Sequence, residues 1–238
     1  MFFFNTGYLF FVFLPILLLS LAARGWVQST YARYSKVPNS TGQTGAQVAQ
    51  RILAGSGLSH VQINIIDGDL TDNYDPRTKT LNLSRGVATS TSVAAEAVAA
   101  HEIGHAQQDA QGYFAMQWRS GLVPVANLGS QAAPLIVVAG LILSWLSGGA
   151  FGLVIAELGL ALFAMVVLFN LVTTPVELNA SHRALGLLAE NGAILPEEQA
   201  GARQMLRAAA FTYWVALIAS ILTLLYYASL VFGNRRNN

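Results

Sequence analysis

The amino-acid sequence predicts a mainly helical membrane protein with about four transmembrane helices and a small α+β domain that contains a short β-sheet. Charged residues make up 11% of the 238 residues, and hydrophobic residues make up 54%. Soluble domains contain about 25% charged residues, so this composition is typical of a membrane protein. The hydrophobic residues gather in long runs that alternate with polar stretches, and the first polar stretch is long enough for the α+β domain.

The composition also excludes several kinds of site. The formal net charge is +1 and lysine and arginine form no cluster, so we expect no nucleic acid partner. The chain has no cysteine, which excludes disulfide bonds and cysteine-ligated metals. Any metal ion must therefore be bound by His, Asp or Glu, and the lipid bilayer is the expected surroundings of the hydrophobic runs.

The first hydrophobic run, from Phe2 to Ala23, predicts a transmembrane helix as the N-terminal domain, 1–23. A helix of this length reaches about 33 Å, which is enough to cross the hydrocarbon core of a bilayer. A cleaved signal peptide is the alternative, because Ser20 and Ala22 are small residues where cleavage could occur. No lysine or arginine precedes the run, which is longer than a usual signal core, so we expect a retained helix.

The following polar stretch, 24–121, has the pattern of a helix, two strands and a second helix. Apolar residues recur on one side of the first helix, and polar and apolar residues alternate in both strands. The predicted elements are a helix over 46–54, strands over 61–65 and 78–84 with a turn at 73–77 between them, and a helix that begins near Ser92.

One stretch of this second helix, His101-Glu102-Ile103-Gly104-His105, has the pattern H-E-x-x-H. The residues before it are rich in alanine and lack glycine and proline, so helix is the favoured state. Residues four apart share a helix face, so both imidazoles can bind one Zn²⁺ ion. Glu102 is rotated by about 100° from His101, where it can take a proton from a water molecule beside the metal. The pattern indicates a zinc metalloprotease with Glu102 as its catalytic base.

Hydrophobic runs at 132–146, 151–172 and 211–232 predict three more transmembrane helices. With four crossings, the polar stretch that carries the motif and the one after the third helix lie on the same side of the membrane. The remaining predicted domains are a transmembrane hairpin over 122–172, a helical segment over 173–210, and a transmembrane helix with its tail over 211–238.

The second polar stretch offers candidates for a third zinc ligand. Pro175 suits the first position of a helix and Thr174 suits its N-cap, so we expect a helix to begin here. Glu177 then lies three residues past the cap, where its carboxylate could serve only to cap the helix. The alternative is that Glu177 completes a His₂Glu zinc site with one open position, and His182 is a further candidate. The position of Glu177 directly after a span favours it as the ligand.

Two stretches, His101–Gln108 and Pro175–Ala184, resemble the YugP-type neutral zinc metallopeptidases of bacterial membranes. Further parts of the chain fit that family's pattern, so the resemblance covers nearly the whole sequence. They are Tyr74–Arg77, Leu81–Ser84 and Leu122–Pro124.

More distantly, the chain is similar to the HtpX and CAAX-processing membrane proteases. Their third-ligand helix carries Glu-x-x-Ala-Asp, where this chain has Glu177, Ala180 and Ser181. The resemblance implies a gluzincin-like domain in which His101, His105 and Glu177 bind zinc and Glu102 is the general base. A carboxylate role at position 181 does not transfer, because serine stands there.

Four residues near the expected ligands are candidates for supporting roles. Asp109 follows His105 by four residues and can orient its imidazole, and Gln108 is a weaker candidate for the same role. An exposed, solvated position is the alternative for Asp109. His182 and Arg183 can stabilise the oxyanion of a tetrahedral intermediate, unless they belong to a solvated helix surface.

We expect the strand over Thr78–Ser84 to be an exposed edge strand beside the zinc. Such a strand can bind an extended peptide through main-chain hydrogen bonds. The alternative is that it serves only the sheet. The residues assigned to substrate contact are Thr80, Leu81, Asn82 and Leu83.

Together the residues predict a membrane-embedded zinc endopeptidase that acts on peptide or protein substrates, including membrane proteins. The alternative is a non-catalytic scaffold with a structural zinc, which His182 could close as a fourth ligand. Arg24, Arg33 and Lys36 flank the motif side of the spans, against Arg235 and Arg236 on the other. The positive-inside rule therefore predicts a cytoplasmic catalytic side. The family resemblance implies that the membrane is a bacterial cytoplasmic membrane.

Overall fold

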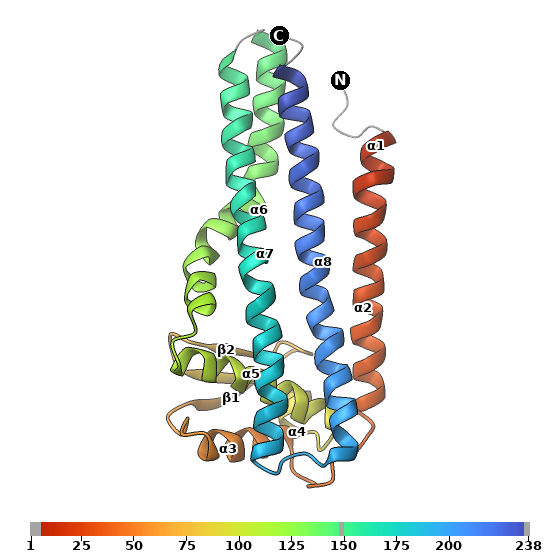
Figure 1. Cartoon of the computed structure of the whole chain (residues 1–238), viewed down its shortest axis with the longest axis vertical. Coiled ribbons are helices and arrows are strands. Elements are labelled where there is room, and N and C mark those ends of the chain that lie inside the picture. Colours follow the sequence, from red (N-terminus) through yellow and green to blue (C-terminus); the bar gives the residue numbers. More distant parts are fainter. Residues whose placement is uncertain (1–5, 148–149, 236–238) are drawn as a thin grey trace. The chain divides into compact units, whose positions relative to one another are not determined.

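The computed structural model describes residues 6–147 and 150–235, which are mainly helical (Figure 1). The start of the predicted N-terminal helix (2–5) and Arg236 lie outside this range. In chain order the elements are α1 (Thr6–Tyr8), the π-helical η1 (Leu9–Phe13), α2 (Leu14–Tyr34), α3 (Gly45–Gly55), β1 (Gln62–Ile66), β2 (Asn73–Asp75), β3 (Thr80–Ser84), α4 (Arg85–Thr89), α5 (Val93–Ala110), α6 (Phe114–Ser147), α7 (Ala150–Glu190) and α8 (Pro196–Arg235).

The chain divides into two compact units. The first contains residues 1–22, 118–174 and 213–238, and the second contains residues 23–117 and 175–212. The second unit holds the sheet and every candidate site residue that the sequence predicted.

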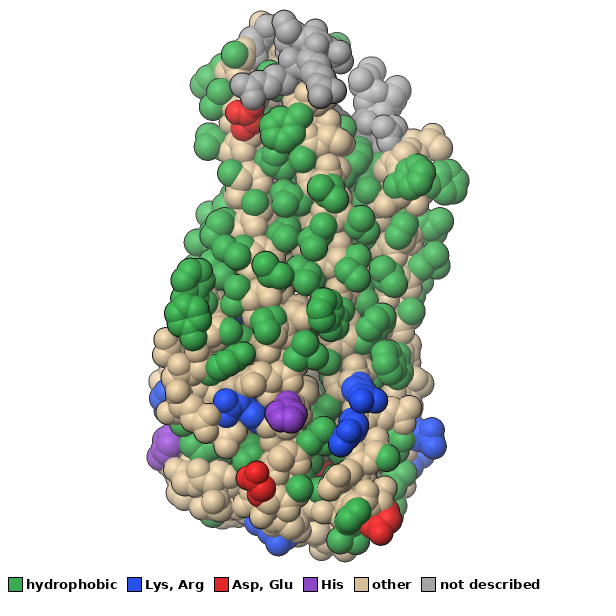
Figure 2. Space-filling model, in the orientation of Figure 1, with side chains coloured by type: hydrophobic (Ala, Val, Ile, Leu, Met, Phe, Trp, Pro, Cys, Tyr) green, Lys and Arg blue, Asp and Glu red, His purple; other side chains and the backbone are tan. Residues whose placement is uncertain are grey.

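Four of the described helices are long and apolar enough to cross a membrane, which confirms the predicted number. On the face shown in Figure 2, hydrophobic side chains cover the helices of the first unit, with little charge among them. Many hydrophobic side chains of the first unit are exposed, such as Phe11 at 77% and Leu135 at 72%. A helix that is apolar on all sides suits a lipid environment. The membrane-capable helices are Thr6–Tyr34, Phe114–Ser147, Ala150–Glu190 and Pro196–Gly233.

The sheet of the second unit has three strands in the order β1-β3-β2. Strand β3 pairs with β1 in parallel and with β2 in antiparallel orientation. The prediction of an edge strand at Thr78–Ser84 is therefore wrong, because β3 has a partner on both sides. The prediction of only two strands is also wrong. Strand β2 was read as a turn because its three residues show no apolar alternation.

One face of the sheet joins the core of the second unit. Leu81 and Leu83 of β3 are fully buried in one cluster with Val48 and Ile52 of α3 and Ile103 of α5. The alternation of β3 thus directs its leucines toward the helices, as the period of two predicts. This packing holds α5 against the sheet.

Helix α5 carries the motif, and the local sequence sets both of its ends. The Ser92 side chain accepts a hydrogen bond from the N–H of Ala95, which makes it the N-cap. The alanine-rich body favours helix throughout. The helix ends at Ala110, and Gly112 follows with a φ of +63°, a conformation that glycine adopts without strain.

Helix α7 runs without a break from Ala150 to Glu190, so the predicted helix start at Pro175 is wrong. A proline removes one backbone hydrogen bond from a helix but does not always end it. Thr174 is not an N-cap, because its hydroxyl donates to the carbonyl oxygen of Asn170 one turn earlier. Glu177 therefore has no helix start to cap.

Candidate metal centre

Three side chains from α5 and α7 converge on one point. The Nε2 atoms of His101 and His105 lie 3.2 Å and 3.4 Å from the same oxygen, Oε2 of Glu177. The two imidazole rings are nearly perpendicular, at 85°. Glu177 is 1% exposed and His105 is 6% exposed, so water barely reaches them.

These separations suit a zinc ion. Ligands that bind Zn²⁺ tetrahedrally at about 2.0–2.1 Å lie roughly 3.3 Å apart, close to both distances in this cluster. A negatively charged oxygen that faces two imidazole nitrogens also favours a cation between them. Within residues 6–147 and 150–235, His101, His105 and Glu177 are the only group of three or more potential ligands close enough to share a metal. Three protein ligands leave a fourth position open, as in catalytic zinc sites.

Gly104 allows α5 and α7 to approach closely enough for this convergence. A Cβ atom added at Gly104 would lie 2.5 Å from the carbonyl oxygen of Ala180, nearer than real side chains approach. Gly104 immediately precedes His105, and Ala180 follows Glu177 by three residues on α7. The contact therefore lies beside the donors and sets the separation between them. This role was not predicted from the sequence, although a glycine inside an alanine-rich helix is the signal that could have revealed it.

Glu102 is buried, at 9% exposed, next to His101 on α5. Burial raises the pKa of Glu102 to about 7, against the lowering effect of His101. The nearby charges of Glu177 and Asp72 also raise it, and a hydrogen bond from the backbone N–H of Tyr74 lowers it. A carboxylate with a pKa near 7 can both accept and release a proton at neutral pH.

Comparison with known proteins supports this interpretation. Residues 9–232 match the family described as "Putative neutral zinc metallopeptidase". A relative from Bacillus subtilis (strain 168), described as "Putative membrane protease YugP", is 39% identical over 230 residues, which cover 96% of this chain and 99% of the relative. The chain belongs to this zinc metallopeptidase family. No solved structure matches it. The family indicates zinc as the cofactor, in agreement with the donor set.

Each of the two histidines also has a partner at its Nδ1 atom. Oε1 of Gln108 lies 2.9 Å from Nδ1 of His105. The Ser181 hydroxyl lies 3.2 Å from Nδ1 of His101. Ser181 occupies the position where the more distant proteases carry aspartate, and no role was predicted for it from the sequence.

Asp109 contacts other residues than the histidine it was expected to orient. Its Oδ2 accepts a hydrogen bond of 2.7 Å from the Tyr74 hydroxyl. The same oxygen forms an ion pair with Nζ of Lys79 at 2.5 Å. Burial and the bond to Asp109 raise the pKa of the Tyr74 phenol well above its usual range. Asp109 therefore ties the end of α5 to β2 and to the turn before β3.

Arg183 and His182 were candidates for oxyanion stabilisation. Arg183 donates to Oδ1 of Asn179 at 2.6 Å and to the side-chain oxygens of Gln107 and Gln111 at 2.8 Å and 2.7 Å. The bonds to Gln107 and Gln111 join α7 to the C-terminal end of α5, and the three bonds together use Nε and Nη1 of the guanidinium. His182 is exposed on α7 and is not part of the metal-binding group. The geometry of the described residues therefore gives no support to an oxyanion role for either residue.

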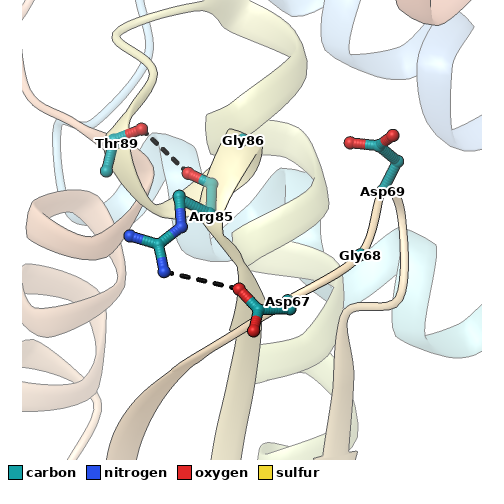
Figure 3. Close-up of a pocket in the computed structure, with 6 residues that line it drawn as sticks. All are labelled: Asp67, Gly68, Asp69, Arg85, Gly86 and Thr89. Atoms are coloured by element: carbon teal, nitrogen blue, oxygen red, sulfur yellow. Dashed lines mark hydrogen bonds and ion pairs between the residues drawn. The ribbon is translucent and has the colours of Figure 1, made fainter.

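A separate hollow of about 480 Å³ lies between the loop after β1 and helix α4 (Figure 3). Asp67 and Arg85 form an ion pair of 3.4 Å there, and the Thr89 hydroxyl donates to the Arg85 carbonyl. Both charged side chains are largely exposed. The hollow contains none of the metal donors, so we assign the chemistry to the His101–His105–Glu177 cluster instead.

Proposed function

We propose that the protein is a membrane-embedded, gluzincin-like zinc endopeptidase. His101, His105 and Glu177 are its zinc ligands, and Glu102 is its general base. The observation that carries the proposal is the convergence of three donors on one point next to a buried carboxylate. Membership of the metallopeptidase family and the open fourth position support catalysis over a purely structural zinc.

His101, His105 and Glu177 would hold the zinc ion, which would lower the pKa of a water molecule and polarise a peptide carbonyl group. Glu102 accepts the proton of the attacking water and then passes it to the nitrogen of the leaving amine. The hydrogen bond from the Tyr74 N–H holds the Glu102 carboxylate in position to accept that proton. Burial keeps bulk water from competing for the same carboxylate.

We infer that an extended substrate pairs with β2 rather than with β3. The N–H of Tyr74 donates to Glu102, so it points away from β3 and toward the metal side of the strand. In a strand, the N–H and C=O of one residue point to the same edge. The outer edge of β2 therefore faces the catalytic base. N-methylation of a peptide substrate should raise KM about tenfold at one paired position, and equal KM values at every position would contradict this assignment.

The substrate class follows from the membrane location. We propose that the enzyme cleaves peptides or proteins, including membrane-proximal segments of membrane proteins, from the cytoplasmic side of a bacterial membrane. The membrane-capable helices and the membrane protease relative support the location. The excess of basic residues beside the motif domain supports the side.

The decisive experiment compares the parent with Glu102→Gln in detergent. The variant should retain one zinc per chain by elemental analysis, because Glu102 is not a ligand. Its cleavage of unfolded casein should fall at least about hundredfold, because the base is lost. Parental cleavage rates in the variant would refute the mechanism. Zinc binding by the parent without any cleavage of casein or membrane-protein fragments would favour the scaffold alternative.

A further inference from the structure

Gln108 is a fully buried amide on α5. It contacts His105 on its own helix and two residues of α7, the helix that carries Glu177. Its Oε1 faces Nδ1 of His105 at 2.9 Å. Its Nε2 lies 2.8 Å from the carbonyl oxygen of Val176 and 2.9 Å from Oδ1 of Asn179, both on α7. Every polar atom of this side chain therefore has a partner.

The partners on α7 fix which end of the amide faces His105. A backbone carbonyl only accepts hydrogen bonds, so the atom that faces Val176 must be the amide nitrogen. Asn179 gives the same answer independently. Arg183 only donates, so the Asn179 atom that receives its Nε is the oxygen, and Gln108 must donate to that oxygen as well.

The remaining atom of Gln108, its oxygen, can only accept. Nδ1 of His105 must therefore carry a proton, and a neutral His105 presents an unprotonated Nε2. That lone pair points toward Oε2 of Glu177, which also only accepts. Two acceptors 3.4 Å apart suit a cation between them, as a zinc ligand pair requires.

We propose that Gln108 is a positioning residue that fixes His105 in its Nδ1–H tautomer, with Asn179 and Val176 holding the amide in its orientation. This inference rests on the proposed function in one respect, which is that His105 is a metal ligand. His101 differs, because its partner Ser181 is a hydroxyl that can donate or accept and so fixes neither tautomer.

The tautomer can be read directly in the metal-free protein. Long-range nitrogen–hydrogen NMR of histidine-labelled protein distinguishes the two neutral forms, and His105→Asn identifies the His105 signals by their loss. We expect the Nδ1–H form in the parent and a mixture of tautomers in Gln108→Met. An Nε2–H form in the parent, or an unchanged form in Gln108→Met, would overturn the proposal.

Zinc affinity, measured by competition with a chromophoric chelator, supplies the second readout. Gln108→Met should bind zinc about 10–100-fold more weakly, as is typical when the partner of a ligating histidine is lost. Gln107→Met is the matched control, since Gln107 neighbours Gln108 but contacts Arg183 rather than a ligand, and we expect less than a twofold change. Equal affinities in both variants would overturn the proposal. A parent that binds zinc through an Nδ1–H His105 but cleaves nothing would refute only the proposed function.

Discussion

Glu177 combines burial with charge, since its carboxylate is 1% exposed and faces two imidazoles. Glu177→Gln preserves the shape but removes the negative charge. We expect its zinc affinity to fall by more than about a hundredfold, because losses of supporting partners alone cost 10–100-fold. Chelator competition measures this, with Glu190→Gln at the exposed end of the same helix as the control. Undiminished affinity in Glu177→Gln would exclude it as a ligand.

Glu96 is a second buried carboxyl on α5, and neither of its oxygens has a hydrogen-bond partner among the described residues. Burial, with a contribution from Glu198, raises the pKa of Glu96 to about 8. The folded state thus keeps a proton that the unfolded state releases near pH 4.5. The free energy of unfolding should fall as the pH rises from about 4.5 to about 8. Above that range, Glu96 should cause no further loss of stability.

Glu96→Gln should flatten this pH dependence, because glutamine cannot ionise. Parent and variant should unfold at similar temperatures near pH 4.5, and the variant should be more stable at pH 9. The limit of the effect is roughly 5 kcal/mol, at 1.36 kcal/mol per pKa unit. Thermal unfolding in detergent across this pH range measures it. Parallel curves for the two proteins would show that Glu96 already ionises in the folded state.

At the scale of secondary-structure elements, the contact between α5 and α7 decides whether the donors meet. Gly104→Ala places a methyl group against the Ala180 carbonyl, so one helix must move. We expect a loss of about 1–3 kcal/mol in stability and a clear loss of zinc affinity. Gly25→Ala is the control, since a Cβ there meets no neighbouring atom. Equal zinc affinity in the two variants would show that the helices tolerate the displacement.

The long-range elements were harder to predict than the local ones. Helix α5 follows from its alanines and its Ser92 cap, which are local signals. Strand β2 has three residues and only Tyr74 buried, so nothing in its sequence marks it as a strand. The edge position of β2 depends on which strand pairs with which, and no local pattern encodes that. Pro175 suggested a helix start because its local propensity favours the first turn of a helix. Local propensity cannot show that tertiary packing allows α7 to continue past Pro175.

The site divides in the same way. His101 and His105 were predictable because a spacing of four places them on one helix face. Glu177 lies 76 residues beyond His101, so no spacing rule applies. Its position directly after a span suggested it as a ligand, and the family resemblance strengthened that expectation. Gln108 and Asp109 were equally placed by helix geometry. Only the tertiary partners separate them, since Tyr74 and Lys79 bind Asp109 while α7 binds Gln108.

For the whole molecule, the proposed topology places both polar stretches in the cytoplasm. The chain contains no cysteine, so a maleimide can label this protein only at the single cysteine that is introduced. In intact cells, a membrane-impermeant maleimide should label Asn234→Cys and leave Arg77→Cys unlabelled, and permeabilisation should expose Arg77→Cys. Position 77 suits the test because its side chain is 91% exposed. The reverse labelling pattern would place the catalytic side outside the cytoplasm.

The distribution of the three donors along the chain also affects biosynthesis. A ribosome that has made α5 but not yet α7 has produced two histidines without their carboxylate, and Gln108 without its acceptors on Val176 and Asn179. Such a nascent chain lacks one of the three proposed metal ligands and the bonds that orient another. With the proposed ligand set, we expect the protein to be inactive until α7 has been made, and a fragment truncated before Glu177 to lack protease activity.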